Sequence, residues 1–323
     1  MKWNLRNISI VFFSCCLLLF ATSARAQFDA QFNQYFYNHT YANPAAVGEA
    51  KMMQISLIQR IQWVGIHNAP ITTDISIHTP FPLRKRPAAH AVGMQLISDV
   101  LGIFANQYIT AQYAYKFKLG NGIFSVGASL GAVNVICYGD SVHISESEYH
   151  TQNDPAVPTG KKSGVGFDAG AGVWYSTDQW YAGVAATHIT GMKIHLGEHA
   201  VFHVMPLITF AGGYNIYFRN NQDYILATRG LAVSDFRSWD FHATALLLYK
   251  NKFWGGLSVR RTGLGLIFGT NFFRGFTIGY AYELPVVGQL LRHTSGSHEI
   301  YLGYEFNLFG GNKNRAYKSV RYL

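Results

Sequence analysis

The chain has 323 residues, of which 49% are hydrophobic and only 13% are charged, with 32 glycines and a formal charge of +9. Soluble domains contain roughly 25% charged residues, so this composition disfavours a soluble enzyme. The 23 Phe and 20 Tyr residues exclude a disordered chain, because disorder requires few aromatic residues and much charge.

The first 26 residues have the pattern of a secretory signal peptide. Lys2 and Arg6 precede an apolar run from Ile8 to Ala21, and Ala24-Arg25-Ala26 has the small residues of a cleavage site. The run of about 14 residues is too short to cross a bilayer as a helix. We therefore expect the mature chain to begin at Gln27, and the loss of three basic residues lowers its formal charge from +9 to +6.

The rest of the chain is predicted to form an all-β fold, a transmembrane antiparallel β-barrel. After residue 26, no stretch reaches the roughly 18 consecutive apolar residues of a membrane-spanning helix. Apolar residues instead alternate with small or polar ones in segments of about ten residues, which is typical of barrel strands. The expected strands number about 14: 51–61, 69–79, 88–98, 104–118, 122–134, 164–176, 179–189, 202–218, 223–233, 238–250, 252–260, 263–272, 275–284 and 297–308.

The character of the two strand faces favours a barrel over a soluble β-sandwich. In residues 263–272 and 297–308, large apolar side chains alternate with Gly, Ser, Asn and Glu. Small and polar residues suit a hydrated lumen behind a lipid-facing wall. Arg260, Glu283 and Glu305 are predicted to face this lumen on neighbouring strands, and we interpret them as a structural ion pair rather than a catalytic acid and base.

Connection lengths predict the orientation of the barrel. With an even number of strands, both ends of the barrel lie on one side, where the connections are tight except for Pro80 to Pro87. The longer connections 135–163, 190–201 and 285–296 lie on the other side. Because outer-membrane barrels have short periplasmic turns, we expect both termini to be periplasmic.

Four parts of the chain follow from this scheme. They are a signal peptide (1–26), a short N-terminal periplasmic or plug segment (27–50), the barrel (51–309) and a basic periplasmic tail (310–323). The second part holds the aromatic cluster Phe28, Phe32, Tyr35, Phe36 and Tyr37, which predicts either a lumen plug or a contact with a partner. The last strand holds Tyr301-x-Gly303-x-x-Phe306-x-Leu308, a pattern that resembles the terminal strand read by the outer-membrane insertion machinery.

Several ordered sequence blocks resemble the PorP/SprF family of type IX secretion outer-membrane proteins. The first runs from Phe28 to Asn38 and continues through Tyr41-Ala42-Asn43-Pro44-Ala45, so it includes Phe32, Gln34, Tyr35, Asn43 and Pro44. The later blocks are Arg60-x-Gln62-Trp63-Val64-Gly65, Ala69-Pro70-x-Thr72, Gly93 with Asp99-x-x-Gly102, and Ser297 to Phe306. The chain departs from the family at Ala30 and His39, where members often have proline.

The resemblance implies a PorP-like, non-enzymatic part of the secretion apparatus of Bacteroidota, needed to export cargo with C-terminal sorting domains. It implies that the protein anchors the periplasmic machinery to the outer membrane. The implied partners are a lipoprotein ring of PorK and PorN and a peptidoglycan-binding protein like PorE, besides outer-membrane lipid. It implies no cofactor, nucleic acid or small-molecule substrate.

The distribution of charge predicts a docking surface on the periplasmic side. Its basic residues lie in the longest tight-side turn and in the tail: Arg84, Lys85, Arg86, Arg315, Lys318 and Arg321. Such a rim attracts acidic proteins or anionic head groups. The alternative interpretation is that these residues only mark the membrane boundary.

Other functions have weaker support in the sequence. His195, His199 and His203 with Glu198 have spacings that would hold a metal on a helix, but they lie in a predicted external loop, so no metal site is expected. The catalytic pattern C-x-x-C is absent from the sequence. Because fourteen strands can enclose a pore, the alternative function is a diffusion channel or a transporter of small hydrophobic molecules.

Overall fold

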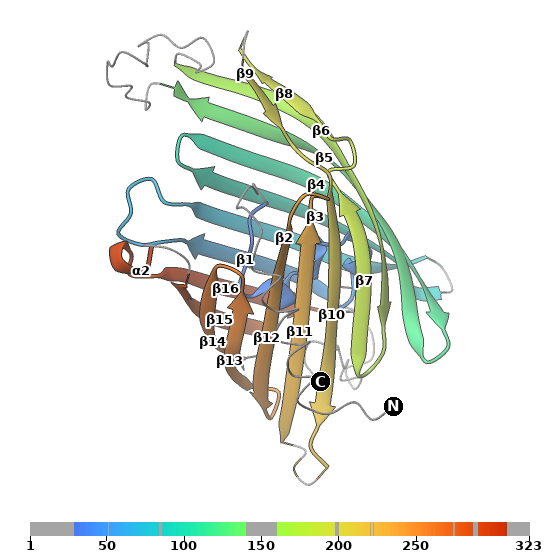
Figure 1. The fold of residues 1–323 in the computed structure, drawn as a ribbon. Coiled ribbons are helices and arrows are strands. Elements are labelled where there is room, and N and C mark those ends of the chain that lie inside the picture. Colours follow the sequence, from blue (N-terminus) through green and yellow to red (C-terminus); the bar gives the residue numbers. More distant parts are fainter. Residues whose placement is uncertain are drawn as a thin grey trace, which may run out of the picture.

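The computed structural model describes residues 29–50, 52–83, 86–139, 160–197, 200–219, 221, 223–273, 275–286 and 290–308. Fourteen antiparallel strands form a closed barrel, and the pairing of the first strand with the last closes the ring (Figure 1). The predicted barrel of about 14 strands is therefore confirmed. The predicted signal peptide and the basic tail 310–323 lie outside the described residues.

The barrel strands differ in length. Those of the first half are β1 (Met53–Ile61), β2 (Ile71–Leu83), β3 (Arg86–Leu101), β4 (Phe104–Leu119), β5 (Gly122–Tyr138), β6 (Lys161–Ser176) and β7 (Trp180–Thr187). Those of the second half are β10 (Leu207–Tyr217), β11 (Tyr224–Ser234), β12 (Trp239–Tyr249), β13 (Phe253–Arg260), β14 (Gly263–Phe272), β15 (Phe276–Pro285) and β16 (Ser297–Phe306). Strands β2 to β6 have 13 to 17 residues, and the other barrel strands have 8 to 11. A short helix, α2 (Leu290–His293), precedes β16.

Two predicted boundaries are wrong. The strand predicted at 202–218 is divided, because Pro206 has no N–H to donate to a ladder and the barrel strand β10 begins only at Leu207. The longer turn predicted from Pro80 to Pro87 is instead strand, since β2 runs to Leu83 and β3 begins at Arg86, with a register shift between Phe81 and Leu83.

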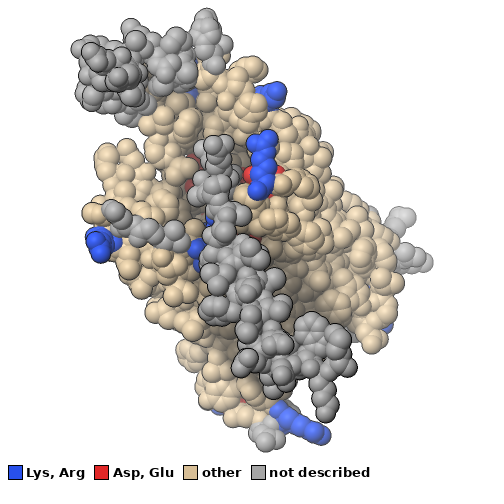
Figure 2. Space-filling view, in the orientation of Figure 1, with Lys and Arg blue, Asp and Glu red and all other residues tan. Residues whose placement is uncertain are grey.

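The wall has an apolar outer face, as the alternation predicts. Burial alternates at every residue of β12, and in β14 Leu264, Leu266 and Phe268 are more than half exposed while Ile267 is buried. On the side drawn in Figure 2, charged side chains are few. This exposed apolar surface is what a lipid-facing barrel requires.

The two ends of the barrel differ in their connections. We call the end with the tight connections, such as 120–121 and 250–252, the turn end. We call the opposite end, which carries residues 62–70, 188–206 and 286–296, the loop end. This asymmetry matches the one expected from the sequence.

Residues 29–50 lie inside the ring of strands, where Figure 1 shows them in blue. We call this part the lumen segment. It forms three single-turn 3-10 helices, η1 (Tyr35–Tyr37), η2 (His39–Tyr41) and η3 (Pro44–Ala46), and Asn43 caps the last of them by accepting a hydrogen bond from the Ala45 N–H. Within the described residues, no helix is long and apolar enough to cross a membrane.

A second inward element lies at the loop end. The strands β8 (Lys193–Leu196) and β9 (Ala200–His203) form a hairpin that packs on the inner face of β5 and β6. Ile194 belongs to one buried apolar cluster with Val133 and Val135. Gly164 of β6 permits this approach, because a Cβ there would collide with the backbone of His195.

The orientation of the wall predicts the effect of a charge on its outer face. Replacing Leu266 with Arg in the middle of β14 should lower the free energy of unfolding by about 2–4 kcal/mol, because the guanidinium would enter lipid. Denaturant titration in lipid vesicles measures this change. Thr262→Arg, in the exposed turn before β14, is the matched control and should shift the value by less than about 0.5 kcal/mol. Equal effects of the two variants would contradict the assignment of the outer face.

Candidate functional site

The candidate site is the contact between the barrel wall and the lumen segment. Its central group is the fully buried carboxylate of Glu299 in β16. One oxygen accepts the backbone N–H of Asn33 and the other that of Gln34, both at 2.8 Å. Arg60 of β1 donates from Nη1 to the same carboxylate at 3.1 Å. Glu299 thus binds the lumen segment to the two strands that close the ring.

The same arginine extends the network to the next strands. Arg60 Nη2 lies 3.0 Å from the Glu283 carboxylate of β15, and Arg260 Nη1 of β13 lies 3.3 Å from it. The predicted ion pair of Arg260 and Glu283 is confirmed. Glu305, expected beside them, lies at the turn end of β16 opposite Gln54. The partner that the prediction missed is Glu299, which faces Arg60 directly in the β1–β16 register.

Further polar contacts hold the lumen segment along its length. The Asn38 amide donates to the Asp74 carboxylate of β2 at 2.5 Å, and Gln95 of β3 donates to the same group at 3.0 Å. Gln112 of β4 donates to the Thr40 carbonyl at 2.8 Å. Because buried polar groups are costly unless they are paired, these contacts fix the segment in one position.

His39 of the lumen segment contacts another residue of the segment and a residue of the wall. The two ring nitrogens of His39 lie 3.1 Å from the Glu49 carboxylate and 3.0 Å from the Tyr181 hydroxyl of β7. Trp174 of β6 donates from Nε1 to Glu49 at 3.3 Å. Sequence reasoning gave none of these residues a role.

Aromatic packing accounts for the cluster seen in the sequence. The described members of that cluster, Phe32, Tyr35, Phe36 and Tyr37, are buried in the lumen. Tyr37 stacks on Tyr301 of β16 with ring centroids 4.5 Å apart and lies 5.3 Å from Trp254 of β13. Gly127 of β5 leaves room for the opposite end of the segment, because a Cβ there would collide with the backbone of Ala45.

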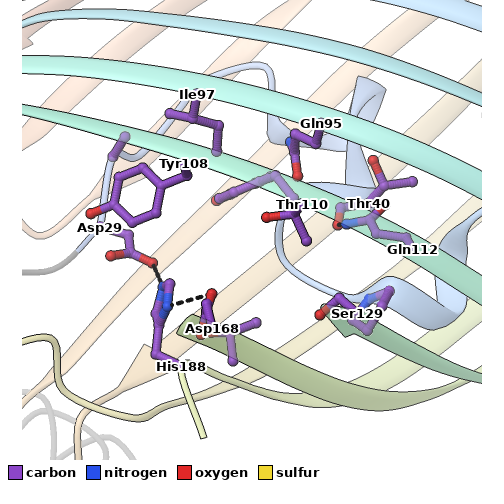
Figure 3. Close-up of a pocket in the computed structure, with 14 residues that line it drawn as sticks. Asp29, Thr40, Gln95, Ile97, Tyr108, Thr110, Gln112, Ser129, Asp168 and His188 are labelled. Atoms are coloured by element: carbon purple, nitrogen blue, oxygen red, sulfur yellow. Dashed lines mark hydrogen bonds and ion pairs between the residues drawn. The ribbon is translucent and has the colours of Figure 1, made fainter. Parts of the chain in front are cut away.

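At the start of the segment, one histidine lies between two carboxylates. His188, just after β7, contacts Asp29 through Nε2 at 2.5 Å and Asp168 of β6 through Nδ1 at 2.9 Å (Figure 3). Burial by itself lowers the pKa of His188, but the two carboxylates outweigh burial and raise the pKa to about 10. The imidazolium therefore anchors Asp29 to the wall at neutral pH.

Space remains beside this anchor. A pocket of about 50 Å³ lies between the lumen segment and strands β3 to β6, and Asp29, Gln95, Tyr108 and His188 are among the residues that line it (Figure 3). Its lining mixes carboxylate, amide, hydroxyl and apolar groups. The lumen is thus largely filled but not solid.

The residues singled out in the sequence fall into separate places. Phe32, Gln34, Tyr35, Asn43 and Pro44 are all in the buried lumen segment, and Arg60 is in the charge network. Gln62 and Trp63 lie in the β1–β2 connection, where the Trp63 N–H donates to Ser297 Oγ at 3.2 Å. In the pattern that resembles the strand read by the insertion machinery, Tyr301 and Gly303 face the lumen. Leu308 follows β16 and is exposed.

The residues expected to dock a partner and the histidines considered for a metal site lie in different parts of the chain. Arg84, Lys85, Arg315, Lys318 and Arg321 lie outside the described residues, and Arg86 is described only as the first residue of β3. His195 and His203 belong to the β8–β9 hairpin and not to a helix. Glu198 and His199 lie outside the described residues. Within the described part of the chain, no three His, Cys, Asp or Glu side chains converge to hold a metal ion.

The charge network predicts a large effect of removing one partner. Glu299→Ala leaves two backbone N–H groups without an acceptor and Arg60 with Glu283 alone, so it should lower the free energy of unfolding by about 3–5 kcal/mol. Denaturant titration of the vesicle-inserted protein measures this change. The control is Asp223→Ala, which removes the exposed pair with Lys250 at 3.7 Å and should leave stability unchanged. A similar small effect of both variants would contradict the role of Glu299.

The raised pKa of His188 predicts a pH dependence with a defined sign. The unfolded chain has the ordinary pKa of about 6.5, so the imidazolium contributes its full stabilisation below that pH and loses it as the pH rises through about 10. The difference in unfolding free energy between the wild type and His188→Gln should therefore shrink steadily from pH 6.5 to 10. His203→Gln, at an exposed position in β9, is the control. A difference that stays constant over this range would contradict the anchor.

Comparison with known proteins assigns the chain to a family. The family model for type IX secretion system membrane protein PorP/SprF matches residues 24–304. A search of curated proteins found no match. Among solved structures, the toluene transporter TbuX of Ralstonia pickettii aligns with a TM-score of 0.50 at 11% identity, covering 85% of this chain and 94% of that one.

Two further barrels show lower structural similarity. The monoaromatic hydrocarbon channel CymD aligns with a TM-score of 0.48 at 13% identity, over 88% of this chain and 96% of that one. The Pseudomonas putida toluene transporter TodX aligns with a TM-score of 0.47 at 11% identity, over 84% of this chain and 94% of that one. At these identities the solved structures bear on the fold alone, whereas the family model covers most of the chain. The chain therefore belongs to the PorP/SprF family of type IX secretion system membrane proteins, and it is an outer-membrane β-barrel.

Proposed function

We propose that this protein is a non-enzymatic anchor that joins the periplasmic machinery of the type IX system to the outer membrane and is needed for export of cargo with C-terminal sorting domains. The observation that carries the proposal is the filled lumen. Residues 29–50 occupy it with buried aromatic rings and paired charges. A barrel filled in this way suits a binding component better than a conduit for folded cargo.

The energetic cost of opening the lumen supports the same proposal. Withdrawing the lumen segment would remove its N–H donors from Glu299 and its amide from Asp74, both of which are fully buried. It would also expose the stacked pair of Tyr37 and Tyr301. Each loss is unfavourable, and together they favour a segment that stays in place while the barrel acts.

The proposed partners contact the turn end. Outer-membrane barrels carry their short turns on the periplasmic side, so we place the turn end and the end of strand β16 there. Asp29, where the described chain begins, lies instead at the loop end. On that side we place the basic residues Arg84, Lys85, Arg86, Arg315, Lys318 and Arg321 as the docking surface. The partners would be a lipoprotein ring of PorK and PorN type and a peptidoglycan-binding protein of PorE type, as the family resemblance implies.

A diffusion channel or a transporter of small hydrophobic molecules is the second candidate. The pocket beside Asp29 favours it, because this pocket leaves some lumen space unfilled. The charge network opposes it, since solutes would have to pass buried ion pairs that the lumen segment completes. The two functions differ in ion conductance across planar bilayers.

Docking at the turn end can be tested with two variants. Neutralising Arg84, Lys85 and Arg86 together to Gln, or truncating the chain after Gly311, should release the periplasmic partners in mild detergent and hold sorting-domain cargo in the periplasm. Both variants should still insert and migrate heat-modifiably. Lys161→Gln and Lys162→Gln, at the loop end of β6, together form the control and should retain the partners. Retention by all variants would contradict docking, and open-channel conductance by the wild type would favour the second candidate.

A further inference from the structure

A second cavity, at the loop end, has a chemical character that neither the family nor the proposed function assigns. We call it the vestibule cavity. It has a volume of about 160 Å³ and lies between the β3–β4 hairpin and the chain that follows β9. Asp29, Asp99, Asn106, Phe104, Tyr108 and Phe202 line it.

The polar side of the vestibule cavity consists of hydrogen-bond acceptors. Asp99 of β3 accepts a hydrogen bond from Thr72 at 2.6 Å through Oδ1. Asp29 contacts His188 through Oδ2, and its side chain keeps about a third of its surface exposed. Two carboxylates therefore border the same space. Neither lysine nor arginine is among the described residues that line it.

Asn106 provides an independent sign that this space takes a ligand. Its residue is only 7% exposed, and its Oδ1 atom has no hydrogen-bond partner among the described residues. A buried acceptor without a donor is unfavourable. A ligand carrying N–H groups would satisfy it together with Asp29 and Asp99.

The other side of the vestibule cavity is apolar and aromatic. Phe104 of β4 and Phe202 of β9 lie with ring centroids 5.6 Å apart, and Tyr108 follows Phe104 along the same face of β4. Aromatic faces attract cations, and apolar walls bind a carbon stem. The cavity thus combines negative charge, an unpaired acceptor and aromatic rings.

We propose that the vestibule cavity binds an ammonium or guanidinium group carried on a short apolar stem. Asp29, Asp99 and Asn106 Oδ1 accept its N–H donors, and Phe104 and Phe202 contact the stem. Two sources share this chemistry. One is a free amine that enters from the loop end, and the other is a Lys or Arg side chain of a polypeptide bound there.

The basic groups near the cavity do not neutralise it. Arg60, whose charge acts on Asp99, is itself paired with Glu283 and Glu299. His188 carries one positive charge between Asp29 and Asp168, so that trio keeps a net negative charge. His203 also lines the cavity, and it lies in the β8–β9 hairpin at an exposed position. Asp99 adds a further negative charge. A cation is therefore the ligand that the electrostatics favour.

Calorimetric titration of the full chain in nanodiscs tests the proposal. The probe is phenethylammonium, with neutral 2-phenylethanol as the isosteric comparison. The ammonium should bind at least tenfold more tightly than the alcohol, and Asp99→Asn should remove that advantage. Asp178→Asn, in the turn between β6 and β7, is the matched control and should leave binding unchanged. Equal affinity for the two probes would overturn the proposal.

A second variant keeps the test informative should Asp99→Asn disturb folding. Asn106→Asp adds a negative charge at the unpaired acceptor and should tighten phenethylammonium binding severalfold. Binding by the wild type should also weaken in acid, where carboxylates become protonated. Weaker binding by Asn106→Asp in a barrel that still migrates heat-modifiably would overturn the proposal.

The two sources are separated by comparing probes. A capped tetrapeptide with one lysine next to a phenylalanine represents a polypeptide ligand. Tighter binding of the peptide than of phenethylammonium supports a polypeptide side chain, and the reverse order supports a free amine. Failure of both probes to bind overturns the proposal.

Discussion

The carboxylate of Glu299 is the interaction on which the rest of the structure depends. It accepts two backbone N–H groups of the lumen segment and pairs with Arg60 across the seam where β1 meets β16. The ring closure and the position of the lumen segment are therefore fixed by one buried group. Because a buried charge is tolerated only when it is fully paired, barrel and segment depend on each other for stability.

Several other features follow from this mutual dependence. The wall supplies Asp74 and Tyr181 as partners for the segment, and small residues such as Gly127 make room for its backbone. The outer face needs only to be apolar, so it carries no comparable pattern. The wall contacts that hold the lumen segment therefore come from the lumen side of the strands.

The sequence predicted the parts of this arrangement that are local. The alternation of apolar and small residues in 263–272 correctly predicted which face of β14 points outward. Arg260 and Glu283, both predicted to face the lumen, do form an ion pair. The contacts of Glu299 with Asn33 and Gln34 were beyond reach, because they join residues more than 260 positions apart and depend on barrel register. The β8–β9 hairpin was also missed, since alternation continued past the break that Pro206 imposes.

The account rests on the claim that residues 29–50 are an integral part of the folded barrel. Hydrogen–deuterium exchange of the membrane-inserted protein, followed by mass spectrometry, tests this claim most directly. Peptides covering Asn33, Gln34 and the three 3-10 helices should exchange as slowly as those from β14 and β16, because their amides open only when the barrel does. Exchange of this segment within seconds while the strands stay protected would contradict the account.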